Sequence, residues 1–174
     1  ITANDIANIA IATYGPAVSI TDRIDPKTPQ ECKFSMQYVL AHAAHYGSVR
    51  IEAFEAERMS DPAIQAMLGQ IDLSIDPAVD AEFPARRAAH VTITTKDGRQ
   101  LTHYQPTRKG DPDLPLTDDE LDAKFIELAN PVLGNELTNS LLQKLWQLDE
   151  ISLATALDFA VLKRDHAAGQ NLPN

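Results

Sequence analysis

The sequence predicts an α+β domain, an antiparallel sheet with helices packed on one side (a two-layer domain), followed by C-terminal helices. Short runs with alternating apolar residues indicate strands in the first two thirds of the chain. Longer runs with helical periodicity lie between and after them. Strands and helices do not alternate regularly, as a parallel βαβ fold would require, which favours the α+β class.

The length of the chain allows one substantial core, or one core with an appended helical piece. It has 174 residues, of which 44% are hydrophobic. The strand patterns cease near residue 134, and the rest has helical periodicity. We therefore expect an α+β domain over 1–134 and a helical segment over 135–174.

The first elements are a strand and a helix. Residues 5–13 alternate isoleucine with small residues and predict a half-buried strand. A loop from Tyr14 to Thr28 follows. A helix is then expected from Pro29, which suits a first turn, to Tyr46, with Gly47 as its stop.

The middle of the chain predicts a helix and a second strand. Residues 50–58 are either a short polar helix or a loop. Ser60-Asp61-Pro62 is typical of a helix start, and the helix extends to Leu68. Residues 71–75 alternate as a strand, and 76–87 are expected to be an irregular connection.

A hairpin and a polar loop come next. Two β-rich runs, Ala89 to Lys96 and Arg99 to Tyr104, flank Asp97-Gly98, a dipeptide that favours a tight hairpin turn. The loop that follows contains Lys109-Gly110-Asp111-Pro112. Polar loops between rigid elements often carry function.

The last third of the chain is predicted to be helical. Thr117 and Glu120 have the spacing of a capping box, which starts a helix over 117–130. Further helices are expected over Asn135 to Leu148 and Ser152 to Leu162, before a frayed tail, 166–174.

Charge and composition exclude several classes of protein. The formal net charge of −10 argues against a nucleic-acid binder and against attraction to anionic membranes. No apolar run approaches the roughly 18 residues of a membrane span. Cys32 is the single cysteine, so no intrachain disulfide forms, and a cytoplasmic location fits. The start, Ile1-Thr2-Ala3, leads us to expect part of a longer polypeptide.

Four residues are candidates for a functional site. Arg108 and Lys109 place two cations beside a glycine in the polar loop; the alternative is a structural turn neutralised by neighbouring aspartates. Lys33 has a flexible cationic side chain suited to a carboxylate, although the residue alone favours a solvated lysine on the first helical turn. Tyr14 begins a loop and carries a phenolic proton donor; most tyrosines simply bury the ring.

The histidines do not predict a metal site. His42 and His45 share a helix face, but no acidic residue stands at the positions of an H-E-x-x-H motif. Ordinary packing is the favoured interpretation. The chain also has no G-x-G-x-x-G, P-loop, G-x-S-x-G or C-x-x-C motif, so the residues alone specify no reaction.

Five stretches, in this order and spacing, resemble the C-terminal part of the MmgE/PrpD family, which includes 2-methylcitrate dehydratases, cis-aconitate decarboxylases and an iminodisuccinate epimerase. They are Lys33-Phe34-Ser35-Met36-Gln37-Tyr38-Val39-Leu40-Ala41, Ser60-Asp61-Pro62, Thr95-Lys96-Asp97-Gly98-Arg99, Lys109-Gly110-Asp111-Pro112 with Pro115-Leu116-Thr117, and Leu121-Asp122-Ala123-Lys124-Phe125.

The resemblance implies the lid domain of a two-domain enzyme. Such enzymes are homodimers that act on small di- and tricarboxylates without metal or organic cofactor. They abstract a proton next to a carboxylate, followed by dehydration, decarboxylation or epimerisation. From loop position and charge, we expect Tyr14 and Lys33 to be catalytic and Arg108 and Lys109 to bind substrate. The family's main acid, histidine and lysine groups lie upstream, so we expect this chain to be inactive alone. The alternative is a non-enzymatic module for small-molecule binding or dimerisation.

Overall fold

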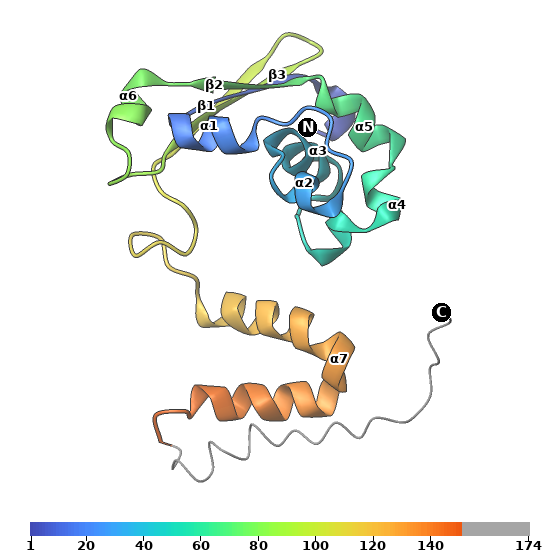
Figure 1. Ribbon diagram of the computed structural model, residues 1–174, viewed down its shortest axis with the longest axis vertical. Coiled ribbons are helices and arrows are strands. Elements are labelled where there is room, and N and C mark those ends of the chain that lie inside the picture. The colour runs from blue at the N-terminus through green and yellow to red at the C-terminus, as the bar shows by residue number, and fades with distance from the viewer. Residues whose placement is uncertain (151–174) are drawn as a thin grey trace. The chain divides into compact units, whose positions relative to one another are not determined.

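The computed structural model of this chain describes residues 1–150, and its contacts group them into two compact units divided between Pro115 and Leu116 (Figure 1). The first unit contains a sheet with helices, and the second is helical. None of the helices in the described part of the chain is long and apolar enough to cross a bilayer. The predicted division into domains over 1–134 and 135–174 stays a prediction.

A four-stranded sheet forms the frame of the first unit. Its strands are β1 (Ile6–Thr13), β2 (Ile71–Ile75), β3 (Ala89–Thr95) and β4 (Gln100–Gln105), in the order β2-β1-β3-β4. The β1–β3 and β3–β4 pairs are antiparallel, as predicted, and β1–β2 is parallel. The α+β class and the mostly antiparallel sheet are therefore confirmed, and the sheet as a whole is mixed.

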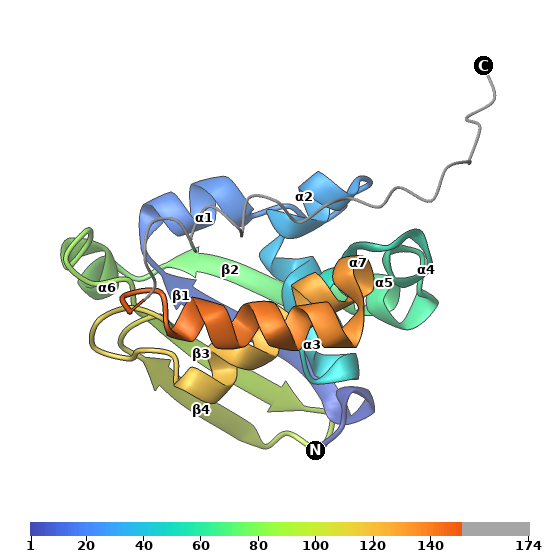
Figure 2. The same cartoon turned by 90° about the horizontal axis from the view of Figure 1, so that it is seen from below.

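Short helices connect the strands. They are η1 (Ala3–Asp5), α1 (Gly15–Thr21), α2 (Pro29–Lys33), α3 (Met36–Tyr46), η2 (Ile51–Phe54), α4 (Ala56–Met59), α5 (Pro62–Leu68) and α6 (Pro77–Ala81). Most of them lie on one side of the sheet, below it in Figure 1, and Figure 2 views the molecule from that side. The helix predicted to end before Gly47 does so, because Gly47 has a φ of +78°, which glycine adopts without strain.

The single helix predicted from Pro29 to Tyr46 is two helices. Ser35 separates them because its extended backbone caps α3, where its hydroxyl accepts a hydrogen bond from the amide of Tyr38. The same hydroxyl donates to the carbonyl of Arg23 at 2.6 Å. These two hydrogen bonds compete with a continuous helix, and α2 ends at Lys33.

Two expected loops contain helices. The segment from Tyr14 to Thr28 begins with α1, which has Pro16 in its first turn. The connection over 76–87 begins with α6, where the Asp76 carboxylate accepts hydrogen bonds from the amides of Ala78 and Val79. A side-chain cap followed by proline starts α6, just as Asp61 and Pro62 start α5.

The core lies between the sheet and the helices. Its buried residues come from β1, β2, α2, α3 and α5, and they include Ile9, Ile11, Cys32, Tyr38, Ala41, Ile64, Leu68 and Ile71. On the other face of the sheet, Ala10, Thr92 and Thr102 stand in register as small or polar side chains. This face therefore gives helices no apolar surface to cover, which explains the one-sided packing.

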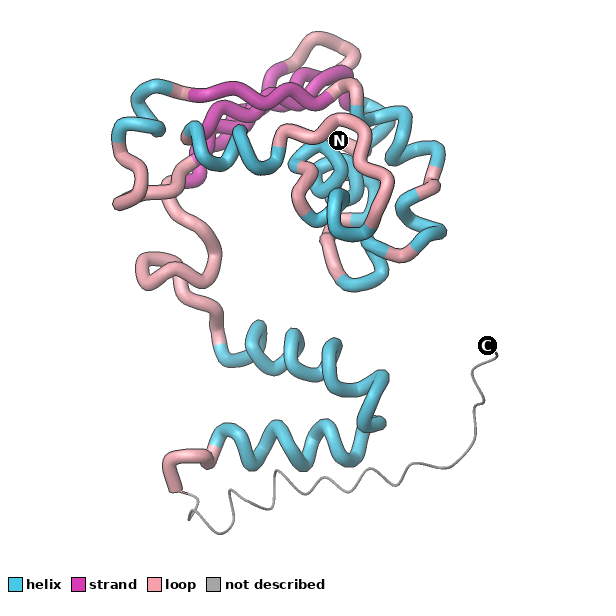
Figure 3. Tube along the Cα trace, in the orientation of Figure 1, coloured by secondary structure: helices cyan, strands magenta, loops and turns pink. Residues whose placement is uncertain are grey.

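The second unit is built from α7 (Asp118–Trp146), which begins with the predicted capping box of Thr117 and Glu120. Gly134 interrupts the helix with a φ of +76°, so two helical arms form, close to the predicted pair (Figure 3). The indole nitrogen of Trp146 donates to Asp122 at 2.6 Å and ties the arms together. The predicted helix over Ser152 to Leu162 and the tail 166–174 lie outside the described residues.

Tyr38 joins the helical layer to a buried turn. Its side chain is fully buried, and its hydroxyl donates a hydrogen bond to the carbonyl of Ala53, which is also fully buried. Burial in this apolar setting raises the pKa of Tyr38 to about 12. The buried phenol therefore satisfies a backbone acceptor that would otherwise be unpaired.

Replacing this hydroxyl tests its contribution to stability. We expect Tyr38→Phe to lower the free energy of unfolding by about 1–3 kcal/mol, because the carbonyl of Ala53 loses its donor inside the core. Tyr104→Phe is the matched control, since Tyr104 is 41% exposed. Urea unfolding followed by circular dichroism measures both. Equal losses in the two variants would contradict the assignment.

The pKa of Tyr38 also predicts a pH dependence. A raised pKa means that the unfolded chain ionises first, so this stabilisation is complete below pH 10.0 and is lost as the pH rises toward about 12. The wild-type chain should lose more unfolding free energy than Tyr38→Phe between neutral pH and this window. Identical pH profiles for the two proteins would show that Tyr38 ionises without hindrance.

Candidate functional site

Four chain segments meet at one end of the sheet. Ile75, Thr13, Ala89 and Gln105 form one row across the four strands in their pairing register. Three strands end at this row and β3 begins there. The segment after β1, the connection from β2 to β3 and the loop after β4 are therefore held at the same end.

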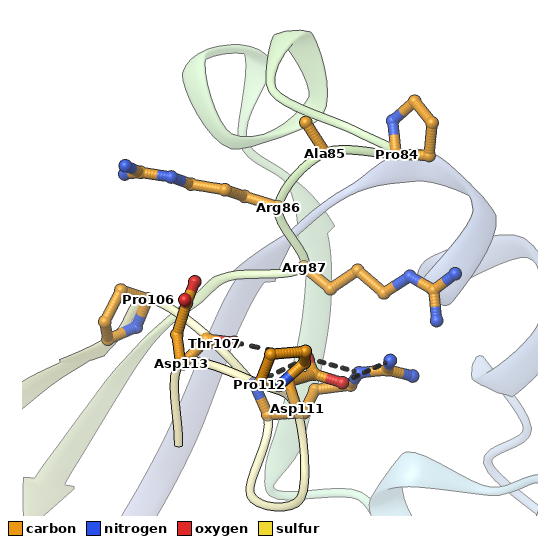
Figure 4. Close-up of a pocket in the computed structure, with 10 residues that line it drawn as sticks. Pro84, Ala85, Arg86, Arg87, Pro106, Thr107, Asp111, Pro112 and Asp113 are labelled. Carbon is orange, nitrogen blue, oxygen red and sulfur yellow. Dashed lines mark hydrogen bonds and ion pairs between the residues drawn. The ribbon is translucent and has the colours of Figure 1, made fainter. Parts of the chain in front are cut away.

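The connection from β2 to β3 and the loop after β4 line an open pocket of about 540 Å³, formed by residues from 84–87 and 106–113 (Figure 4). The hydroxyl of Thr13 donates to the carbonyl of Ala88 at 2.8 Å, which fixes the backbone beside Arg87. The pocket wall holds three arginines, Arg86, Arg87 and Arg108, against two aspartates, Asp111 and Asp113. The wall therefore carries an excess of positive charge in a chain whose net charge is −10.

Arg108 is clamped by Asp111. Its Nε and Nη2 donate to the two carboxylate oxygens of Asp111 at 3.1 and 2.7 Å, and its backbone amide donates at 3.3 Å. This hydrogen bonding lowers the pKa of Asp111 and raises the pKa of Arg108. A guanidinium has five N–H donors, so those not used by Asp111 are available to a ligand.

The charge of Tyr14 adds a smaller upward contribution to the pKa of Arg108, so the two groups lie within electrostatic range. Tyr14 caps α1, and its ring stacks on Phe83 with centroids 4.9 Å apart and planes 13° apart. The next residue, Gly15, donates its amide to Asp80 at 2.7 Å. Tyr14 is therefore held at this end by a ring on one side and a backbone anchor on the other.

Arg87 completes the stack. Its guanidinium lies 5.9 Å from the ring centroid of Phe83, on whose ring Tyr14 also packs. The sequence pattern did not identify Arg87 or Phe83 as site residues. The signal available was a pair of arginines directly before a predicted strand, because a residue there must lie at the end of the sheet.

The structure brings three of the four predicted site residues to this end. Tyr14 and Arg108 are described above, and Lys109 is exposed in the turn that continues through Gly110, which has a φ of +95°. Lys33 lies elsewhere: it ends α2, with its ammonium 5.5 Å above the ring of Phe54. Figure 1 shows α2 away from α6 and its loop.

The described residues contain no cluster of three or more His, Cys, Asp or Glu side chains suited to a metal ion. His42 packs in the core, where its Nδ1 lies 2.9 Å from the carbonyl of Ser48. Chemically, the end of the sheet offers guanidinium donors and a phenol. Such groups bind carboxylates and stabilise negative charge that develops on them.

Known proteins resemble this chain over most of its length. It is 28% identical to the cis-aconitate decarboxylase of Mus musculus and 26% identical to that of Homo sapiens, each over 145 residues and 82% of this chain. It is 33% identical to the 2-methylcitrate dehydratase of Cupriavidus necator over 104 residues, 57% of this chain. The aligned parts cover 30%, 30% and 22% of these relatives, so the chain spans less than a third of their length.

A family model agrees with these relatives. The model of the MmgE/PrpD C-terminal domain matches residues 1–148, which include both the sheet and α7. The chain therefore belongs to the MmgE/PrpD family, as its C-terminal domain.

Proposed function

We propose that this chain is the C-terminal part of an enzyme that acts on a small di- or tricarboxylate by abstracting a proton next to a carboxylate. Dehydration and epimerisation begin with this step. In decarboxylation, the loss of carbon dioxide leaves an equivalent carbanion, which then takes up a proton. The relatives support the proposal, because they are a decarboxylase and a dehydratase of carboxylates. Their greater length supports a second domain, over whose active site this part closes.

The observation that carries the proposal is the meeting of Tyr14, Arg87 and Arg108 at one end of the sheet. Removal of a proton beside a carboxylate turns that group into an enediolate, whose extra charge needs nearby cations. In this proposal Arg108 and Lys109 bind the substrate's carboxylates. Tyr14 donates a hydrogen bond or a proton.

Other parts of the proposal rest on the family alone. Lys33 retains its predicted catalytic role, although its position over Phe54 gives that role no added support. A homodimer and a cytoplasmic location are proposed on the same basis. Closure of a lid domain would exclude water from the cleft and strengthen the electrostatic effect of the arginines.

Turnover tests this proposal. We expect the full-length polypeptide to convert cis-aconitate, 2-methylcitrate or iminodisuccinate, with products followed by proton NMR in deuterated water. A decarboxylation or an epimerisation should place deuterium at the carbon next to a carboxylate, whereas a dehydration should give an unsaturated product that has lost this proton. Tyr14→Phe should lower kcat by roughly 10²-fold or more, as expected for loss of a proton donor.

The control for this experiment is Tyr104→Phe, which removes a hydroxyl from β4 and should keep full activity. A folded protein that neither converts nor binds any of the three carboxylates would contradict the proposal. That result would favour a non-enzymatic module that has kept the fold.

The clamp on Arg108 gives a further prediction. We expect Asp111→Asn to raise KM roughly tenfold, because Arg108 loses the bidentate carboxylate that orients it. The lowered pKa keeps Asp111 ionised until the pH falls below its ordinary value of 3.8, so the effect should not vary across neutral pH. Steady-state kinetics at several pH values measure it.

Asp113→Asn is the matched control, since it removes the same charge from the same pocket wall without breaking the clamp. It should lower KM slightly, because the pocket becomes more positive. If both variants lowered KM alike, Asp111 would act only through its charge and the orienting role would be wrong.

A further inference from the structure

We propose that Arg87 is the main carboxylate anchor of this domain, and that Phe83 and Tyr14 hold its guanidinium in place. The inference rests on the proposed function and adds a residue to it.

The three arginines of the pocket wall differ in their acidic partners. Two side-chain nitrogens of Arg108 donate to the carboxylate of Asp111, and the shorter distance, from Nη2 to Oδ1, is 2.7 Å. Arg86 lies 3.7 Å from the carboxylate of Glu82. Arg87 forms no ion pair with a carboxylate anywhere in residues 1–150. Its charge is therefore the least compensated of the three.

Arg87 is held by its backbone and by the ring of Phe83. Its backbone neighbour Ala88 is 1% exposed, and the carbonyl of Ala88 is bonded to Thr13. The guanidinium lies near the face of Phe83, a cation–π contact that costs no hydrogen-bond donor. All five N–H donors of Arg87 consequently remain available, while the side chain is only half exposed.

The side chain of Arg87 points in a different direction from that of Arg86. Figure 4 shows the side chains of Arg86 and Arg87 leaving the loop toward opposite sides. The stack continues from Arg87 through Phe83 to Tyr14, so Arg87 shares a rigid unit with the phenol at the end of β1. A carboxylate on Arg87 would thus be positioned relative to Tyr14.

The donors of Arg87 determine which ligand this pocket binds. A guanidinium with a free planar edge binds a carboxylate through two parallel hydrogen bonds, which fixes orientation as well as position. Arg108, already paired with Asp111, can add a single donor to the same ligand. Arg87 and Arg108 together favour a substrate with at least two carboxylates. One carboxylate is anchored at Arg87, and another lies beside the reacting carbon.

Kinetics and binding of the full-length polypeptide test the inference. Arg87→Gln should raise KM for cis-aconitate or 2-methylcitrate, whichever is turned over, by roughly 30-fold or more, because the ligand's buried charge loses its partner. The kcat value should change far less. Arg87→Lys should recover only part of the loss, since an ammonium lacks the planar pair of donors.

Two control variants remove the same charge elsewhere. Arg99→Gln lies in the hairpin turn at the opposite end of the sheet, where Arg99 pairs with Asp97, and should leave KM within about twofold. Arg86→Gln should raise KM much less than Arg87→Gln. Circular dichroism and urea unfolding confirm that each variant folds.

A second readout uses the substrate itself. Replacing the anchored carboxylate by a carboxamide should weaken binding to the wild type, measured by calorimetry, and should have little further effect on Arg87→Gln. One monoamide of the substrate should therefore bind the wild type more weakly than the substrate does, yet bind Arg87→Gln about as well as the substrate does. Additive effects for every monoamide would overturn the inference.

The outcomes distinguish the inference from the proposed function. Normal turnover with equal KM values for the wild type and Arg87→Gln would reject Arg87 as the anchor and leave the proposed function intact. No turnover, with carboxylate binding that Arg87→Gln abolishes, would support the anchor and reject the enzyme. No binding of any carboxylate to the wild type would reject both.

Discussion

The pairing of β1 with a parallel strand on one side and an antiparallel strand on the other is the constraint on which the rest of the domain depends. Because β1 and β2 run in the same direction, they end together. Because β3 runs in the opposite direction, it begins where they end. This one arrangement gathers the segments that carry Tyr14, Arg87 and Arg108, which are up to 94 residues apart (108 − 14).

The same end of the sheet shows how an acidic protein presents a cationic site. Several carboxylates of residues 1–150, such as Asp61 and Asp76, lie at helix starts, where they accept hydrogen bonds from backbone amides. Around the pocket, two of the three arginines have acidic partners that fix them or reduce their charge. The third is held by a ring, which positions it without neutralising it.

Local signals in the sequence predicted much of this fold. Asp97-Gly98 specified the hairpin, Gly47 the end of α3, and Thr117 with Glu120 the start of α7. Asp76-Pro77 repeats the signal of Asp61-Pro62, yet α6 was missed because only 5 residues follow, too few to show a period. The break at Ser35 needed a tertiary partner, the carbonyl of Arg23, which no local pattern reveals.

The site was predictable only in part, for the same reason. Tyr14, Arg108 and Lys109 stood out because they lie in loops. Arg87 did not, because its importance comes from a ring at position 83 and from the pairing of strands far apart in the sequence. Parallel pairing of β1 with β2 involves a separation of about 60 residues, which strand periodicity alone cannot assign (Ile9 with Ile71).

The most direct test of the central claim is a crystal structure of the full-length polypeptide with citrate bound. The account predicts a carboxylate of the ligand within about 3 Å of the guanidinium of Arg87, with Arg108 still bound to Asp111. A ligand bound without contact to residues 84–87 or 106–113 would contradict it.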